Sequence, residues 1–311
     1  MARADETLFV KDDHACSPIA SPDGSKVVYT RIGTSEEGPQ GEVMVVDSRG
    51  APLAKKRLAE GFAVAWTEDS ERIVCHCGSI ARLVALDGSS DHEAGMLRPG
   101  GPPAFLSTLD ELVWKQDGRV IRPDGAGLPS PAGHEAGNLL APSPGGRYLA
   151  SLYDTADWSP LRVYDFEKKT WRDLGVVQTN LVEGLHWDRM VPPWSPWTQD
   201  GSHIAFVTTA NDVVLATPDG AERVVVAHPE KRATTPVPSP GGTMVAFVVH
   251  EESRPPRSWV AVGMPDVGTV VLTSTVDMTT NALTWLGDDA IVFDRLDEYR
   301  TTQLWRVRVP R

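Results

Sequence analysis

One segment in the second half of the chain holds the densest group of side chains that could bind a ligand or transfer a proton. His186 and Asp188 could act together as a general acid and base, with the carboxylate orienting the imidazole ring. Arg189 follows them and could stabilise an anion, while the rings of Trp187 and Trp194 could form a stacking surface. We therefore expect a functional site here, with the alternative that the segment folds over itself and buries its own tryptophans.

A second group of candidates consists of polar residues that precede short apolar runs. They are His14, Glu60, Asn138, Arg189, Arg232 and Asn281. If the runs are strands around one axis, these groups converge on a central pocket that suits a small polar ligand or ordered water. His14 is also a candidate for proton transfer, and Trp158 for shaping the pocket. No fixed ligand spacing supports a metal shared by His14 and Glu60, so we expect neither a metal nor a cofactor.

Composition and charge exclude several classes of partner. A formal charge of −12 over 311 residues repels a nucleic-acid backbone and an anionic membrane surface. The first residues carry no apolar signal core, and no stretch approaches the roughly 18 apolar residues of a membrane span. The three cysteines make no disulfide framework, and Cys75 and Cys77 fit small core residues of a strand. We expect a cytoplasmic protein that binds neither nucleic acid nor membrane.

The elements that must position these side chains are repeated. A turn sequence followed by an apolar run begins at Ser21 ("SPDG"), Thr67 ("TEDS"), Ser143 ("SPGG"), Thr198 ("TQDG") and Ser239 ("SPGG"), with weaker copies at Leu109 and Leu286. Ser or Thr with Asp or Gly two residues later suits a tight turn. The consecutive apolar positions that follow indicate a strand buried on both faces. Further strands follow each copy, so we expect four-stranded antiparallel units.

The spacing of the copies predicts the fold. The steps from turn to turn average about 44 residues, the repeat length of a β-propeller blade. We count seven units, which predicts an all-β protein with a single domain over residues 1–311, a seven-bladed β-propeller. The last unit lacks an outer strand, and we expect residues 6–11 to supply it and close the ring. The alternative is a six-bladed ring, in which the weak unit near Leu109 merges with a neighbour.

The repeated motif resembles that of a known family. "SPDG" before an apolar strand, preceded by Trp (Trp66, Trp197, Trp285) or Pro (Pro142, Pro238), is similar to the WD-like TolB-type propeller repeat. The same repeat builds the propeller of prolyl-oligopeptidase-like enzymes, and the resemblance covers nearly the whole chain. It implies the fold of a stand-alone propeller but no activity. Neither the signal peptide and α/β domain of exported TolB nor the G-x-S-x-G elbow of the hydrolases is visible in this sequence.

The lengths of the connections predict which face carries the site. The turns between first and second strands are short and alike, whereas the links between second and third strands and between blades vary widely. All the variable links lie on one face by connectivity, and the longest contains His186 and Trp194. Long loops in compact repeat proteins tend to be functional. We therefore expect the site on this loop-rich face.

We expect a monomeric binding module that holds a protein or peptide partner, or a small polar molecule, at the loop-rich face and channel mouth. The negative charge favours a neutral or basic partner. The alternative is an enzyme of lyase, hydrolase, cyclase or isomerase type, with His186 or His14 as acid or base. In that case Asp188 would assist the imidazole, and Arg189 or Arg232 would stabilise an anion. The sequence leaves both functions open.

Overall fold

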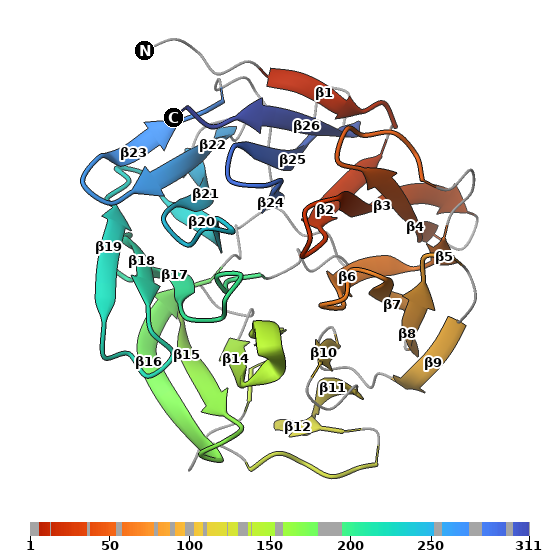
Figure 1. Cartoon of the computed structure of the whole chain (residues 1–311), viewed down its shortest axis with the longest axis horizontal. Helices are drawn as coiled ribbons and strands as arrows, with labels where there is room; N and C mark the ends of the chain where they lie inside the picture. The colour runs from red at the N-terminus through yellow and green to blue at the C-terminus, as the bar shows by residue number, and fades with distance from the viewer. Residues whose placement is uncertain are drawn as a thin grey trace.

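The computed structural model describes residues 6–12, 14–35, 38–53, 58–77, 80–87, 91–96, 103–107, 111–122, 124–129, 136–137, 139–152, 158–179, 195–251, 257–273, 282–296 and 301–310. Over these residues the regular structure is 26 strands and one short 3-10 turn, Pro144–Gly146. Figure 1 shows the strands arranged in small sheets around a central axis. None of the described residues forms a helix that could cross a lipid bilayer.

The strands fall into seven groups that follow one another around the ring. The first group is β2 (Ala15–Ala20), β3 (Lys26–Ser35), β4 (Gly38–Asp47) and β5 (Ala59–Glu60). The second is β6 (Phe62–Trp66), β7 (Arg72–Cys77), β8 (Ile80–Ala85) and β9 (Asp91–Met96). The third is β10 (Ala104–Leu106), β11 (Glu111–Gln116) and β12 (Arg119–Ile121). The fourth is β13 (Leu139–Pro142), β14 (Tyr148–Leu152), β15 (Trp158–Asp165) and β16 (Thr170–Gln178).

The remaining three groups complete the circle. The fifth is β17 (Ile204–Thr208), β18 (Val213–Ala216) and β19 (Arg223–Ala227). The sixth is β20 (Ala233–Pro238), β21 (Val245–Glu251), β22 (Arg257–Met264) and β23 (Gly268–Val271). The seventh is β24 (Leu283–Trp285), β25 (Ala290–Leu296), β26 (Thr302–Arg308) and β1 (Glu6–Val10). The seven-bladed β-propeller is confirmed.

Two blades differ from the predicted four-stranded unit within the described residues. The inner strand of the fifth blade is reduced to a single bridge between Trp197 and Ile204. The outer strand of the third blade is likewise a single bridge, between Ile121 and Gly127. Pairing of Val177 in β16 with Thr208 in β17 also joins the fourth and fifth blades into one seven-stranded sheet.

The first strand of the chain closes the ring, as predicted from residues 6–11. β1 pairs antiparallel with β26, with Glu6 opposite Val307 and Leu8 opposite Trp305. In Figure 1 the red β1 lies along the dark blue β26. The side chains of Glu6 and Arg295 add an ion pair of 2.5 Å between β1 and β25. The outer edge of β26 is therefore covered by the chain's own beginning.

The hydrophobic core is divided among the contacts between blades. Seven clusters of buried side chains exist among the described residues, and each is built from two neighbouring blades. Val27 and Val28, on consecutive positions of β3, are both fully buried because they face opposite neighbours. This arrangement explains the runs of consecutive apolar residues in the second strands.

The repeated turn is held by its own polar side chains. The Ser21 hydroxyl donates to Asp23 Oδ1 at 2.5 Å, and its oxygen accepts the N–H of Lys26 at 3.0 Å. Gly24 adopts a φ of +68°, which an L side chain rarely takes. One hydroxyl, one carboxylate and one glycine therefore form the "SPDG" turn, and the "TQDG" turn at Thr198 uses the same three groups.

Candidate functional site

A pocket of about 240 Å³ opens on the axis of the ring, and we call it the axial pocket. It lies on the turn face, which is the face that carries the turns between the first and second strands. Each of the seven blades contributes lining residues at the end of its inner strand or in the following turn. One example from each blade, in chain order, is Pro22, Glu68, Phe105, Pro144, Gln199, Pro240 and Thr284. The pocket therefore exists only in the closed ring.

The walls of the axial pocket are mainly apolar. Trp66, Trp197 and Trp285 line it from corresponding positions of three blades, and each is more than nine-tenths buried. Each indole Nε1 donates a hydrogen bond to the inner strand of the preceding blade. The acceptors are the carbonyl oxygens of Ile19, Ala141 and Val237, at 2.9, 2.9 and 2.8 Å. Because these N–H groups are already hydrogen-bonded within the protein, the indole rings present only apolar surface to a ligand.

Two polar side chains cross between blades at the mouth of the axial pocket. Gln199 of the fifth blade donates from Nε2 to the carbonyl oxygen of Pro22 in the first blade, at 3.0 Å. Glu68 of the second blade accepts the Ser107 hydroxyl of the third blade at 2.7 Å. The same oxygen of Glu68 accepts the N–H of Gly145 in the fourth blade. Hydrogen bonds at the mouth therefore join the fifth blade to the first, and the second blade to the third and fourth.

The turns around the mouth carry ionised carboxylates. The N–H of Ser202 and the hydroxyl of Thr198 donate to Asp200, and these bonds lower the pKa of Asp200 to about 2. Partial burial alone would raise the pKa of Asp23, but hydrogen bonds led by the Ser21 hydroxyl lower it to about 2. At neutral pH, two of the turns around the mouth therefore carry ionised carboxylates, and that of Asp23 lies 3.7 Å from Lys26.

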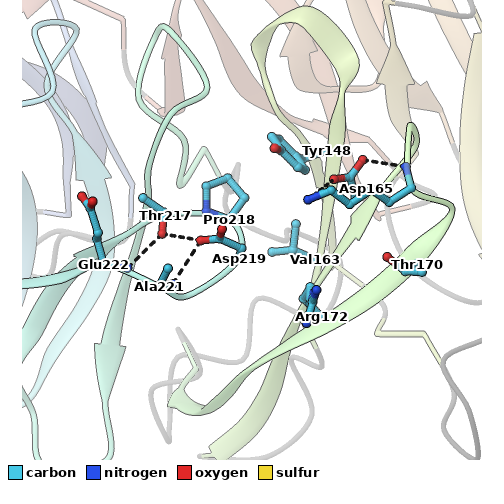
Figure 2. A pocket seen from close by; sticks show the side chains of 11 residues that line it. Tyr148, Val163, Asp165, Thr170, Arg172, Thr217, Pro218, Asp219, Ala221 and Glu222 are labelled. Atoms are coloured by element: carbon cyan, nitrogen blue, oxygen red, sulfur yellow. Dashed lines mark hydrogen bonds and ion pairs between the residues drawn. The ribbon is translucent and has the colours of Figure 1, made fainter.

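A second pocket, of about 170 Å³, lies between the fourth and fifth blades on the turn face. Figure 2 shows Thr217, Asp219 and Glu222 on one side of it and Tyr148 and Asp165 on the other. Its lining carries charges of both signs, since Lys168 and Arg172 also contribute.

The carboxylates of this second pocket are used by their own turns. Asp165 is buried, which alone would raise its pKa, but the N–H groups of Lys168 and Glu167 lower it by hydrogen bonding. Asp219 accepts the Thr217 hydroxyl at 2.7 Å and the N–H of Ala221 at 3.0 Å. These hydrogen bonds give both carboxylates a structural role in their own turns. The axial pocket is therefore the stronger candidate site.

Most of the site residues expected from the sequence lie outside the described residues. This applies to His186, Trp187, Asp188, Arg189, Trp194, Asn138 and Asn281. Their predicted roles on the loop-rich face stay predictions.

The structure places His14 and Arg232 at corresponding positions, just before the inner strands β2 and β20. The carbonyl oxygen of His14 accepts the N–H of Ile32, and that of Arg232 accepts the N–H of His250. His14 is exposed and has a φ of 73°. Burial, aided by the charge of Arg232, lowers the pKa of His250 to about 4, so its imidazole is neutral at pH 7.

Glu60 lies two residues before the inner strand β6, and Trp158 lies in the third strand of the fourth blade. Glu60 is in β5, opposite Glu42 of β4, because the outer strand of the first blade extends to this residue. Trp158 begins β15 opposite Gln178 and is 48% exposed. Within the described part of the chain, no three His, Cys, Asp or Glu side chains are grouped in a way that could hold a metal ion.

Sequence reasoning missed the axial pocket because it treated the turn face as uniform. The signal was present, since Trp66, Trp197 and Trp285 all precede turns of the repeat. The structure shows that the same positions also surround the axis.

No protein-family model and no curated protein matches the sequence. Solved structures match almost end to end. One is an oligogalacturonate lyase in complex with manganese, with a TM-score of 0.63 and 12% identity over 100% of this chain and 99% of that one. Another is the β-propeller domain of Cps50 (Swd1) from Myceliophteria thermophila, with a TM-score of 0.60 and 11% identity over 97% and 99%. These likenesses show the fold.

A third match is a chain in the mitotic checkpoint complex, with a TM-score of 0.57 and 13% identity. The alignment covers 100% of this chain and 92% of that one. The three matched structures are those of an enzyme, a propeller domain and a protein assembly, so the shared propeller fold is compatible with both catalysis and binding.

Proposed function

We propose that the protein is a binding module that holds a polypeptide partner over its turn face, with one partner side chain in the axial pocket. The observation that carries this proposal is the axial pocket itself, which is apolar, open at the turn face and built by all seven blades. A pocket of this kind suits an anchor residue, because interfaces concentrate their binding energy in a few side chains that fill pockets.

The size and rigidity of the axial pocket support the same function. Burying an aliphatic or aromatic side chain contributes about 1.5–3 kcal/mol. The pocket of about 240 Å³ holds such a group with room to spare. The mouth is already ordered by the bonds from Gln199 to Pro22 and from Ser107 to Glu68. A partner would therefore lose little binding energy to ordering this surface.

The test is selection from a random peptide display library on the immobilised protein. The wild type is expected to enrich one class of peptide. The variant Ser195→Phe is expected to enrich none, because Ser195 is an exposed residue of the pocket lining and a ring there fills the mouth.

The matched control is Ala51→Phe, which adds the same ring to an exposed turn residue outside the pocket lining. This variant should enrich the same peptides as the wild type. Equal enrichment by Ser195→Phe, or no enrichment by the wild type, would contradict the proposal. The enzyme alternative stays a prediction, since His186 and Asp188 lie outside the described residues and the described contacts of His14 do not test its role as acid or base.

A further inference from the structure

We propose that the axial pocket selects a lysine or arginine side chain of a basic polypeptide, with Glu68 contacting its charged head. This inference rests on the proposed function and specifies the partner's chemistry. It follows from three features of the pocket, which are its apolar walls, two acceptors at its mouth that can take a further hydrogen bond, and the ionised carboxylates of the nearby turns.

The walls suit the aliphatic stem of such a side chain. Phe105, Trp66 and Trp285 line the pocket, and the indole N–H groups of Trp66 and Trp285 are bonded within the fold. Long cationic side chains bury their methylene stems against apolar surface while the charged head stays near water. Aromatic rings also attract a cation electrostatically. A cavity of about 150 Å³ holds benzene, and this pocket measures about 240 Å³.

Glu68 supplies a carboxylate with capacity left for the cationic head. Its Oε1 accepts the Ser107 hydroxyl at 2.7 Å and the N–H of Gly145. Both donors are neutral, so they orient the carboxylate without cancelling its charge. Its Oε2 accepts no hydrogen bond among the described residues, and the side chain is exposed at the mouth. Hydrogen bonds to a charged donor are stronger than those between neutral groups.

A second acceptor at the mouth is the carbonyl oxygen of Pro22. Gln199 reaches it across the axis at 3.0 Å, from 177 residues along the chain. A carbonyl oxygen has two lone pairs. The N–H of an incoming ammonium or guanidinium group can therefore donate to this oxygen beside Gln199, or can take the place of Gln199 as its donor.

The charges around the mouth favour a cation over an anion. Lys26 and Arg72 are the basic residues of the first two turns, and each lies near a carboxylate of its own turn. The distances are 3.7 Å from Lys26 to Asp23 and 3.6 Å from Arg72 to Asp69. Asp200, held ionised by its hydrogen bonds, and Glu68 add negative charge beyond these pairs. A basic segment would thus be attracted to the mouth and its side chain retained there.

The test uses the peptides enriched from the display library. We expect each to contain a lysine or arginine that is essential for binding. Replacing an essential arginine by citrulline, its neutral analogue, should weaken binding to the wild type about tenfold. Binding should also weaken as the salt concentration rises, because salt screens the attraction.

The residue-level test is a double-mutant cycle between the peptide and Glu68→Gln. The glutamine keeps an acceptor for Ser107 and Gly145 while removing the charge. The arginine peptide should bind this variant about fivefold to tenfold more weakly than the wild type. The variant should also distinguish arginine from citrulline by less than about twofold. The control is Glu71→Gln, an exposed residue of the same turn outside the pocket lining, which should behave as the wild type.

The outcomes separate this inference from the proposed function. Enrichment of apolar peptides without an essential cation would overturn the inference and leave the proposed function standing. No enrichment at all would overturn both. Basic peptides whose binding shows no coupling to Glu68→Gln would refute the contact with Glu68. Free n-butylguanidinium binding as tightly as the peptides would show a small cation to be the occupant, which contradicts a polypeptide partner.

Discussion

At the scale of single residues, three tryptophans have one shared structural role. Trp66, Trp197 and Trp285 each place an indole N–H on the carbonyl oxygen of the preceding blade's inner strand. The bond joins two blades at their ends nearest the axis, where a buried carbonyl would otherwise lack this donor. The repeated Trp before the turn is therefore explained by contact between blades as well as by apolar burial.

We predict that Trp285→Phe lowers the free energy of unfolding by about 2–4 kcal/mol. The change removes the bond to Val237 and leaves space around a smaller ring. Urea unfolding followed by circular dichroism measures the difference. Trp158→Phe is the control, because Trp158 is 48% exposed, and it should change stability by less than about 0.5 kcal/mol. Equal effects of the two substitutions would refute this role for Trp285.

Only those residues of the site that belong to a local sequence pattern could be predicted from the sequence. The positions of Trp66 and Trp285 before their turns were evident from the repeat. The contact of Gln199 with Pro22 was not, since it joins residues 177 apart that share no pattern. Nothing in the local sequence distinguishes a glutamine that crosses the axis from one in solvent.

At the scale of elements, the turns and second strands were predicted well because each is determined by nearby residues. The hydroxyl and carboxylate of Ser21 and Asp23 form the turn, and the apolar run after it fills two blade interfaces. The outer strands were harder, because a strand at the rim needs few apolar residues. The outer strand of the third blade is a single bridge between Ile121 and Gly127.

Strand β1 is the strand whose removal should most affect the stability and association of the protein. We predict that deleting residues 1–11 lowers the melting temperature and causes association. The deletion exposes the edge of β26 and removes Phe9 and Val10 from the core between the seventh and first blades. Light scattering coupled to size-exclusion chromatography measures the association. Deleting only residues 1–5 is the control and should leave a stable protein. A stable, unassociated protein after the longer deletion would refute closure by β1.

At the scale of the whole molecule, stability is distributed around a ring. Each of the seven core clusters joins two neighbouring blades. Every blade is therefore supported from both sides, as long as the ring stays closed. The sequence allowed this architecture to be predicted because its repeat length and its unpaired first strand both required a closed circle of blades.

We predict that the protein still folds when its chain ends are moved to another blade. Glu6 lies opposite Val307, so a short linker can join the two ends of this sequence, and new ends can be opened at Asp266 between β22 and β23. The permuted chain should fold, because β23 then closes the sixth blade as β1 now closes the seventh. Circular dichroism and urea unfolding test this expectation. An unfolded permutant would show that closure at the seventh blade has a special role.

The pairing of β1 with β26 also affects how the protein is made. Strand β1 is translated well before its partner strand, Thr302–Arg308. At roughly 5–20 residues per second, β1 waits about 15–60 s with no partner strand. During that interval its sequence, "ETLFV", is an open apolar edge on the nascent chain. We therefore expect this short segment to lack its partner strand for most of the time that the ring takes to be synthesised.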